Sequence, residues 1–135
     1  MTSLQKKQLQ TAIEKSWTRE TSSVPDEWSK EQASRGQCVP TALVVQDYLE
    51  GELQRLVTVF GGQEESHYRN ILPDGSIFDA SRSQYPDNQD LHITKVALNG
   101  FSSIRDKRLN ERDTLLRYQL LKGLVERQLS NESLE

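Results

Sequence analysis

Three side chains of this sequence have the types and the order that nucleophilic catalysis requires. Cys38, the only cysteine, stands where a flexible turn runs into an apolar stretch. In a helix, the first turn carries unpaired backbone N–H groups and the positive end of the dipole, which together stabilise a thiolate. His67 and Asp79 follow and could supply a base and a carboxylate that orients it. The alternative is a small buried hydrophobic residue, the commonest role of a lone cysteine.

Whether His67 and Asp79 can meet depends on the turn between them. A two-residue turn would place the two side chains on opposite faces of the hairpin. A three-residue loop over 73–75 pairs Arg69 with Asp79 and makes His67 and Asp79 diagonal neighbours on one face. The Pro-Asp-Gly sequence favours this longer loop, with Gly75 in the left-handed conformation. In the other register His67 would be an ordinary sheet histidine and Asp79 a hydrogen-bond acceptor at a strand end.

The residues around Cys38 predict the start of a central helix. Gly36 permits a sharp entry, and Pro40 suits the first helical turn because it has no N–H to lose. The unbroken apolar run 42–45 is typical of a helix that is buried on more than one side. We expect this helix to end near Gly51.

The remaining pattern predicts helices around a small antiparallel sheet. A first helix over 3–20 begins at Ser3 as N-cap and buries Leu4, Leu9, Ala12, Ile13 and Trp17. An ordered loop over 21–37, held by Trp28, leads to the central helix. Strands are predicted over 53–60, 66–72, 76–80 and about 91–98. A last helix starts at Asn110 and buries Leu116, Leu120, Leu121, Leu124, Val125 and Leu129. This is a single α+β domain over 1–135, with a polar tail at about 131–135.

Composition narrows the function classes. The chain has 17 Lys and Arg against 20 Asp and Glu, a net charge of −3, and no basic run, so we do not expect nucleic-acid binding. One cysteine cannot form an internal disulfide, and residues 1–20 show neither a signal peptide nor a membrane span, so we expect a cytoplasmic protein. The cysteine and the two histidines are dispersed, which predicts no metal site, and we expect no cofactor. His92 has no acid at a matching position and is predicted to be structural.

Four segments together resemble the small bacterial YunG-like family. They are Arg35-Gly36-Gln37-Cys38, the stretch 41–47, the stretch 66–75 and Asp79-x-Ser81-Arg82-Ser83-Gln84. In order and geometry, the chain is also similar to transglutaminase-like and cell-wall amidase domains of the papain-like thiol superfamily. The resemblance implies a papain-like core in which Cys38 is the nucleophile, His67 the base and Asp79 the orienting group.

The group that would stabilise an oxyanion is less well specified. In papain-like proteases a glutamine lies six residues before the cysteine, and Gln32 has that spacing, while Gln37 is directly adjacent to Cys38. Most glutamines of this Gln-rich chain are expected at the surface. The Cys38 backbone N–H is therefore the better donor. Gln84, just past Asp79, could line the cleft.

We therefore expect a cysteine-dependent hydrolase or acyltransferase that acts on an amide or ester through an acyl-enzyme. The walls of the site would be residues 63–66 and the loop after Ser81, which are short and polar. This favours a small substrate or a side-chain amide, as in a glutamine deamidase or small amidase, over an extended peptide. A noncatalytic binding module of the same fold and a cysteine peptidase are the alternatives.

Overall fold

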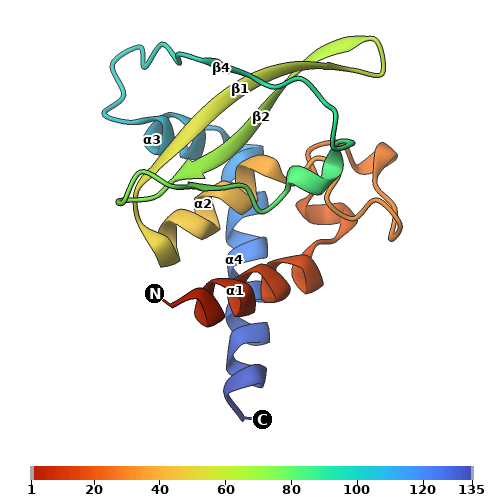
Figure 1. Cartoon of the computed structure of the whole chain (residues 1–135), viewed down its shortest axis with the longest axis vertical. Helices are drawn as coiled ribbons and strands as arrows, with labels where there is room; N and C mark the ends of the chain where they lie inside the picture. Colours follow the sequence, from red (N-terminus) through yellow and green to blue (C-terminus); the bar gives the residue numbers. More distant parts are fainter. Residues whose placement is uncertain (1, 135) are drawn as a thin grey trace.

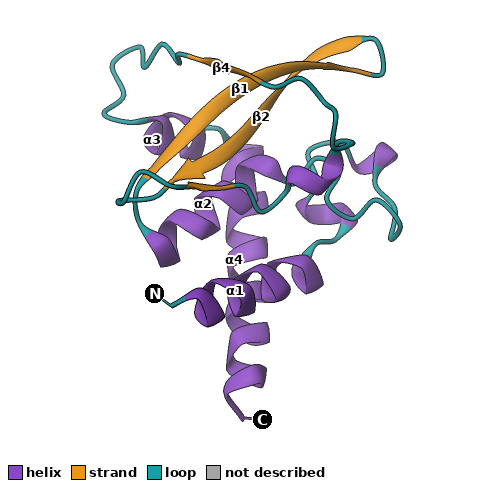
Figure 2. Cartoon of the chain, viewed as in Figure 1, coloured by secondary structure: helices purple, strands orange, loops and turns teal. Residues whose placement is uncertain are grey.

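Helix α2 (Cys38–Leu49) lies between an antiparallel sheet and helix α4 (Arg112–Leu134), as Figure 1 shows for the computed structural model, which describes residues 2–134. The sheet has the strand order β3-β2-β1-β4, with β1 over Glu52–Phe60, β2 over Gln63–Ile71, β3 over Ile77–Phe78 and β4 over His92–Thr94. Helix α1 (Ser3–Ser16) packs on α4 at the side away from the sheet, and the short α3 (Ile104–Leu109) precedes α4 (Figure 2). The described residues therefore form an α+β fold in which the cysteine helix is central.

The apolar run of α2 explains this position. Ala42, Leu43, Val44 and Val45 are all at most 2% exposed, so the helix is buried on every side along this stretch. The expectation of a helix enclosed on more than one side is confirmed. The α2 helix ends at Leu49, close to the predicted end, and Gly51 follows with a positive φ.

The hairpin between β2 and β3 has the register that the turn sequence predicted. Asn70 pairs with Phe78, and the Leu72 N–H donates to the Ser76 carbonyl at 2.8 Å across a three-residue loop. Gly75 has a φ of +85°, in the left-handed region. Strand β3 is shorter than predicted, so Asp79 stands just beyond it.

Several predicted boundaries were wrong at the ends of elements. Helix α1 is capped by Thr2 rather than Ser3 and ends at Ser16, because Thr18 caps the following 3-10 turn, η1 (Arg19–Thr21). Leu4 is 66% exposed rather than buried. Strand β2 begins three residues earlier than expected, and β4 spans only part of the predicted 91–98. Helix α3 was not predicted.

The last helix buries Leu121 and Val125, as predicted, but exposes two of the other leucines of the predicted stripe. Leu116 and Leu120 are 52% and 42% exposed, whereas Tyr118, Leu121 and Val125 are buried. Tyr118 faces inward because its hydroxyl donates to Asp47 at 2.6 Å on α2. Helix α4 continues through Leu134, past the point where we expected a polar tail to begin, and Glu135 lies outside the described residues.

The loop before α2 is ordered, as expected. It contains the 3-10 turn η2 (Pro25–Glu27), and the Trp28 indole donates to the Ala33 carbonyl at 2.9 Å. Across residues 2–134, no helix combines the length and the apolar character needed to cross a bilayer.

Candidate active site

Cys38 is the first residue of α2, where the helix leaves N–H groups without helical partners. The N-cap residue Gln37 makes no side-chain capping bond, and the first helical bond runs from the Thr41 N–H to the Gln37 carbonyl. The N–H groups of Cys38 and Val39 therefore have no carbonyl of α2 to bond. The Cys38 side chain is largely buried, and its thiol donates to the Ser66 carbonyl on β2 at 3.9 Å. The thiol thus lies between a helix N-terminus and the strand that carries His67.

The imidazole of His67 binds Asp79 and lies close enough to Cys38 for that side chain to affect its pKa. Its Nε2 lies 2.9 and 2.8 Å from the two carboxylate oxygens of Asp79, and the histidine is fully buried. Burial lowers the pKa of His67, but the Asp79 carboxylate and then the Cys38 side chain, through hydrogen bonds and charge, outweigh it and raise the pKa to about 9. The structure therefore brings together the three residues predicted from the sequence and favours an imidazolium beside the sulfur.

Gln84 contacts the other ring nitrogen of His67. Its Nε2 lies 2.9 Å from His67 Nδ1, while its Oε1 accepts from the Gly36 N–H at 3.2 Å. The second contact identifies the amide oxygen, so the amide nitrogen donates to Nδ1. Nδ1 can accept this bond only while it carries no proton. Gln84 therefore favours the neutral imidazole, against the stronger influence of Asp79 and Cys38. The Gln84 Nε2 hydrogen bond to His67 Nδ1 must break when Nδ1 is protonated.

A charged cluster fastens the loop before Cys38 to the strand of His67. Arg35 forms ion pairs with Glu65 at 2.7 Å and with Glu27 at 3.1 Å, and the Tyr85 hydroxyl donates to Glu65 at 2.7 Å. Burial raises the pKa of Glu65, but the hydrogen bonds from Arg35 and Tyr85 outweigh it and lower that pKa. The Tyr85 ring also packs edge-on against His67, with ring centroids 5.3 Å apart. The cluster thus fixes the cysteine and the histidine relative to each other.

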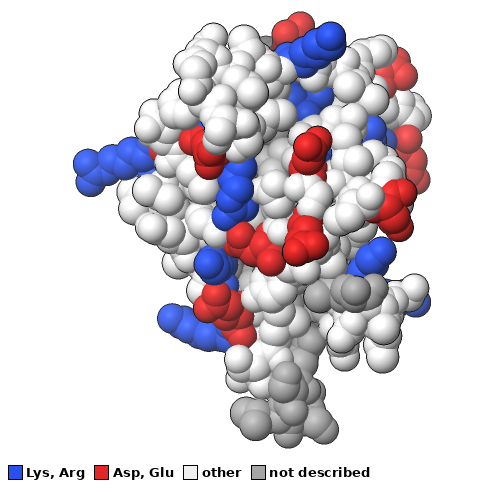
Figure 3. Space-filling model, turned by 90° about the vertical axis from the view of Figure 1, so that its left-hand side faces the viewer, with Lys and Arg blue, Asp and Glu red and all other residues white. Residues whose placement is uncertain are grey.

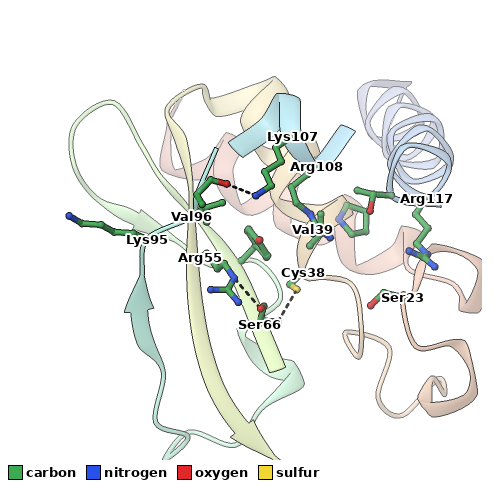
Figure 4. Close-up of a pocket in the computed structure, with 14 residues that line it drawn as sticks. Ser23, Cys38, Val39, Arg55, Ser66, Lys95, Val96, Lys107, Arg108 and Arg117 are labelled. Carbon is green, nitrogen blue, oxygen red and sulfur yellow. Dashed lines mark hydrogen bonds between the residues drawn. The ribbon is translucent and has the colours of Figure 1, made fainter. Parts of the chain in front are cut away.

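Two cavities meet at Cys38. The larger, of about 460 Å³, extends toward α3 and α4 and is drawn in Figure 4. The smaller, of about 300 Å³, is lined by Gln63, Glu65 and Gln84, which belong to the two segments that the sequence predicted as walls. Cys38 and Ser66 line both. The sulfur is therefore reachable from two sides although most of the residue is buried.

The model of the family described as YunG protein matches residues 5–130, a span that runs from α1 into α4 and includes Cys38, His67 and Asp79. The chain belongs to the YunG family. Neither a curated protein nor a solved structure matches the chain significantly. The expected family is therefore confirmed, whereas the papain-like core and the catalytic role of the three residues stay predictions.

The glutamines considered for this YunG-family site lie in different environments. Gln84 is buried beside His67, as described above, with both ends of its amide engaged. Gln37 is fully buried, and its Nε2 donates to the Thr18 carbonyl at 2.9 Å, away from the thiol. Gln32 is exposed and bonds to Ser29 in the preceding loop. Of the three glutamines, only Gln84 contacts one of the candidate catalytic residues, His67.

Two groups of residues at the site were not found from the sequence. No local sequence pattern indicates the contact among Arg35, Glu65 and Tyr85. Arg35 and Glu65 nevertheless lie close to Cys38 and His67 in the chain. The basic side chains of the larger cavity come mainly from α3 and α4. The basic sequence Arg105-Asp-Lys-Arg108 was the only local pattern that could have indicated α3.

The second histidine, His92, is exposed on β4, apart from Cys38, His67 and Asp79. In residues 2–134 no three His, Cys, Asp or Glu side chains are grouped so that they could hold a metal ion.

Gly36 offers a direct test of how tightly the entry to α2 is built. It has a φ of +77°, and a Cβ there would lie 2.4 Å from Ser22 Oγ and 2.7 Å from Val24 Cγ2. Gly36→Ala is therefore expected to lower the free energy of unfolding by about 2–4 kcal/mol, from backbone strain and overpacking together. Gly75 is the matched control, since its φ is also positive but no atom lies within 4 Å of an added Cβ. Gly75→Ala should cost only about 1 kcal/mol. Urea denaturation checks both, and equal losses would contradict the argument.

Proposed function

We propose that this YunG-family protein is a cysteine-dependent hydrolase or acyltransferase of the papain-like type, acting on an amide or ester through an acyl-enzyme. The observation that supports the proposal best is the position of His67, which binds both carboxylate oxygens of Asp79 and follows Ser66, whose carbonyl contacts the Cys38 thiol at the N-terminus of α2. A histidine confined to a structural role has no need of a thiol and a carboxylate together. These groups have the division of roles of an activated nucleophile.

The proposed reaction uses the proton of the imidazolium twice. The Cys38 thiolate attacks the carbonyl carbon, and the negative charge that forms on oxygen is stabilised by the Cys38 N–H at the start of α2. The intermediate expels the amine or alkoxide, which takes the proton from His67 Nδ1 and leaves a thioester on Cys38. Water, or another acyl acceptor, then attacks the thioester and gives its proton to Nδ1. The acid or the transferred product leaves and the thiolate returns. Asp79 holds the ring through Nε2 in both steps.

The two cavities suit a small substrate. One side can hold the acyl portion, and the other can admit water or release the leaving group. The volumes, about 460 and 300 Å³, are those of small-ligand pockets rather than of an extended peptide groove. We therefore favour a small amide or ester, or the side-chain amide of glutamine, as the substrate class.

Mass spectrometry of wild type and Cys38→Ser tests this function. Both are incubated with a glutamine-containing protein mixture, a peptide library and small thioesters. Wild type should give deamidation or thioester turnover and an acyl adduct on Cys38, and Cys38→Ser neither. Backbone cleavage by wild type alone would instead identify a peptidase. The absence of all turnover, with Cys38 labelled only after denaturation, would favour a binding module that retains the fold.

A further inference from the structure

The larger cavity beside Cys38 is lined by cationic side chains and by no acidic one. Its charged lining consists of Arg55 on β1, Lys95 after β4, Lys107 and Arg108 on α3, and Arg117 on α4. This lining is not a reflection of composition, because the chain has more acids than bases. The face in Figure 3 mixes the two signs. Four parts of the fold thus place positive charge around a single cavity.

Most of these cations lack an anionic partner. Arg55 and Lys107 donate to neutral oxygens, namely Ser66 Oγ at 3.1 Å, Thr94 Oγ1 at 2.9 Å and the Ala97 carbonyl. Lys95 and Arg117 form no ion pair among residues 2–134. A pocket lined by uncompensated charge of one sign concentrates its field on the space it encloses. The cavity therefore attracts anions.

Arg108 is the cation placed best for a ligand. Its one ion pair, at 2.8 Å, is with Glu111, which is 49% exposed, and its guanidinium lies 5.4 Å from the centroid of the Tyr68 ring. Its Nε is buried and has no hydrogen-bond partner among the described residues. A buried donor without a partner is costly unless a ligand satisfies it. An oxyanion is the ligand that the guanidinium fork fits best.

The close-up places the arginines around the thiol. In Figure 4, Arg55, Arg108 and Arg117 lie on different sides of Cys38, whereas Lys95 points away from it. Arg55 and Cys38 also share Ser66, whose hydroxyl accepts from Arg55 and whose carbonyl accepts from the thiol. An anion held by the arginines would thus lie within a small molecule's length of the sulfur.

We propose that the substrate carries an oxyanion, a carboxylate or a phosphate, which binds Arg108 in the field of Arg55 and Arg117 while its amide or ester carbonyl reaches Cys38. This inference rests on the acyl-transfer function above and names the substrate class. Neutral and cationic acyl donors of the same size are poor substrates, because they leave the arginine charges unpaired in the closed complex.

Alkylation with a matched pair of reagents tests the inference without needing catalysis. Iodoacetate and iodoacetamide both transfer their methylene carbon to the Cys38 thiolate and release iodide, but only iodoacetate carries a carboxylate. The ratio of the iodoacetate rate to the iodoacetamide rate should be about tenfold higher for Cys38 than for a cysteine-containing peptide. The iodoacetate rate should saturate with concentration. A rate ratio equal to that of the peptide would overturn the inference.

Charge-removing variants locate the anion. Arg117→Gln and Arg108→Gln should each lower the iodoacetate rate about tenfold and change the iodoacetamide rate little. Arg108→Lys should retain part of the preference. Lys15→Gln, which removes an exposed positive charge in the last turn of α1, is the matched control and should change neither rate. Equal effects of Lys15→Gln and Arg117→Gln would show a nonspecific charge effect and contradict the proposal.

A binding measurement separates failure of this inference from failure of the proposed function. Cys38→Ser is titrated with glutarate, with inorganic phosphate and with neutral glutaramide, and binding is followed by NMR. Glutarate or phosphate should bind, and the stronger of the two identifies the anion, whereas glutaramide should not. If Cys38 is inert to both alkylating reagents but the anions bind in an Arg117-dependent way, the catalytic function fails and the anion site stands. If neither anion binds, the anion site is refuted whatever the thiol does.

Discussion

Replacing His67 with alanine is expected to slow the alkylation of Cys38 by iodoacetamide at pH 6 by about two orders of magnitude. Iodoacetamide reacts with the thiolate, and an unassisted thiol with a pKa of ~8.5 is only about 0.3% ionised at that pH. Under the proposed function, the imidazolium that Asp79 helps to maintain would stabilise the anion on sulfur in the wild type. The two rates should converge above pH 9, where even an unassisted thiol is ionised.

The controls for this measurement are built into the chain. His92→Ala removes the other histidine, which is exposed on β4, and should leave the rate unchanged. Asp79→Asn should have a smaller effect than His67→Ala, because it weakens the orientation and charge of the ring without removing it. Rates are taken from intact-protein mass spectra between pH 5 and pH 9, with circular dichroism to verify folding. If His67→Ala is labelled at pH 6 as fast as the wild type, Cys38 is not activated by the histidine.

The parts of the site that could be predicted from the sequence are those determined by local chemistry. The Pro-Asp-Gly turn fixed the loop length, and the loop length placed His67 and Asp79 on one face of the hairpin. In the same way, Gly36 and Pro40 marked the start of α2 and put Cys38 at its N-terminus. In each case the conformational preferences of two or three adjacent residues were sufficient.

The parts that could not be predicted depend on residues far apart in the chain. Arg35 and Glu65 meet only because the loop before α2 folds against β2, and no spacing rule links them. Helix α3 is six residues long and is held by Arg105, which donates to the Leu43 carbonyl and pairs with Asp47 on α2. Because α3 was not predicted, the basic side chains that line the larger cavity could not be predicted either. Helix α4 has leucines on more than one face, so its pattern did not reveal which face Tyr118 would turn inward.

The second large effect expected is a pH dependence of stability that comes from His67. Its pKa is about 9 in the folded protein, above the ordinary value of 6.5. The folded state therefore holds the proton more tightly than the unfolded state. The resulting stabilisation is fully present below pH 6.5 and is lost as the pH rises through 9. Because His67 is fully buried, the whole pKa shift contributes to the free energy of unfolding, and it corresponds to about 3 kcal/mol.

Urea denaturation of Cys38→Ser and of Cys38→Ser with His67→Gln at several pH values isolates this contribution, because no thiol is present to give its proton to the ring. The free energy of unfolding of Cys38→Ser minus that of the double variant should fall, by up to about 3 kcal/mol, as the pH rises from 6.5 through 9. The same comparison with His92→Gln should be flat, because His92 is exposed. With Cys38 present the fall should be smaller, because below the ordinary thiol pKa of ~8.5 an imidazolium–thiolate pair holds one proton, as a neutral imidazole and a thiol do in the unfolded chain. A difference that does not change with pH in the Cys38→Ser background would mean that the imidazole is neutral in the folded protein, with Gln84 as the dominant partner of Nδ1.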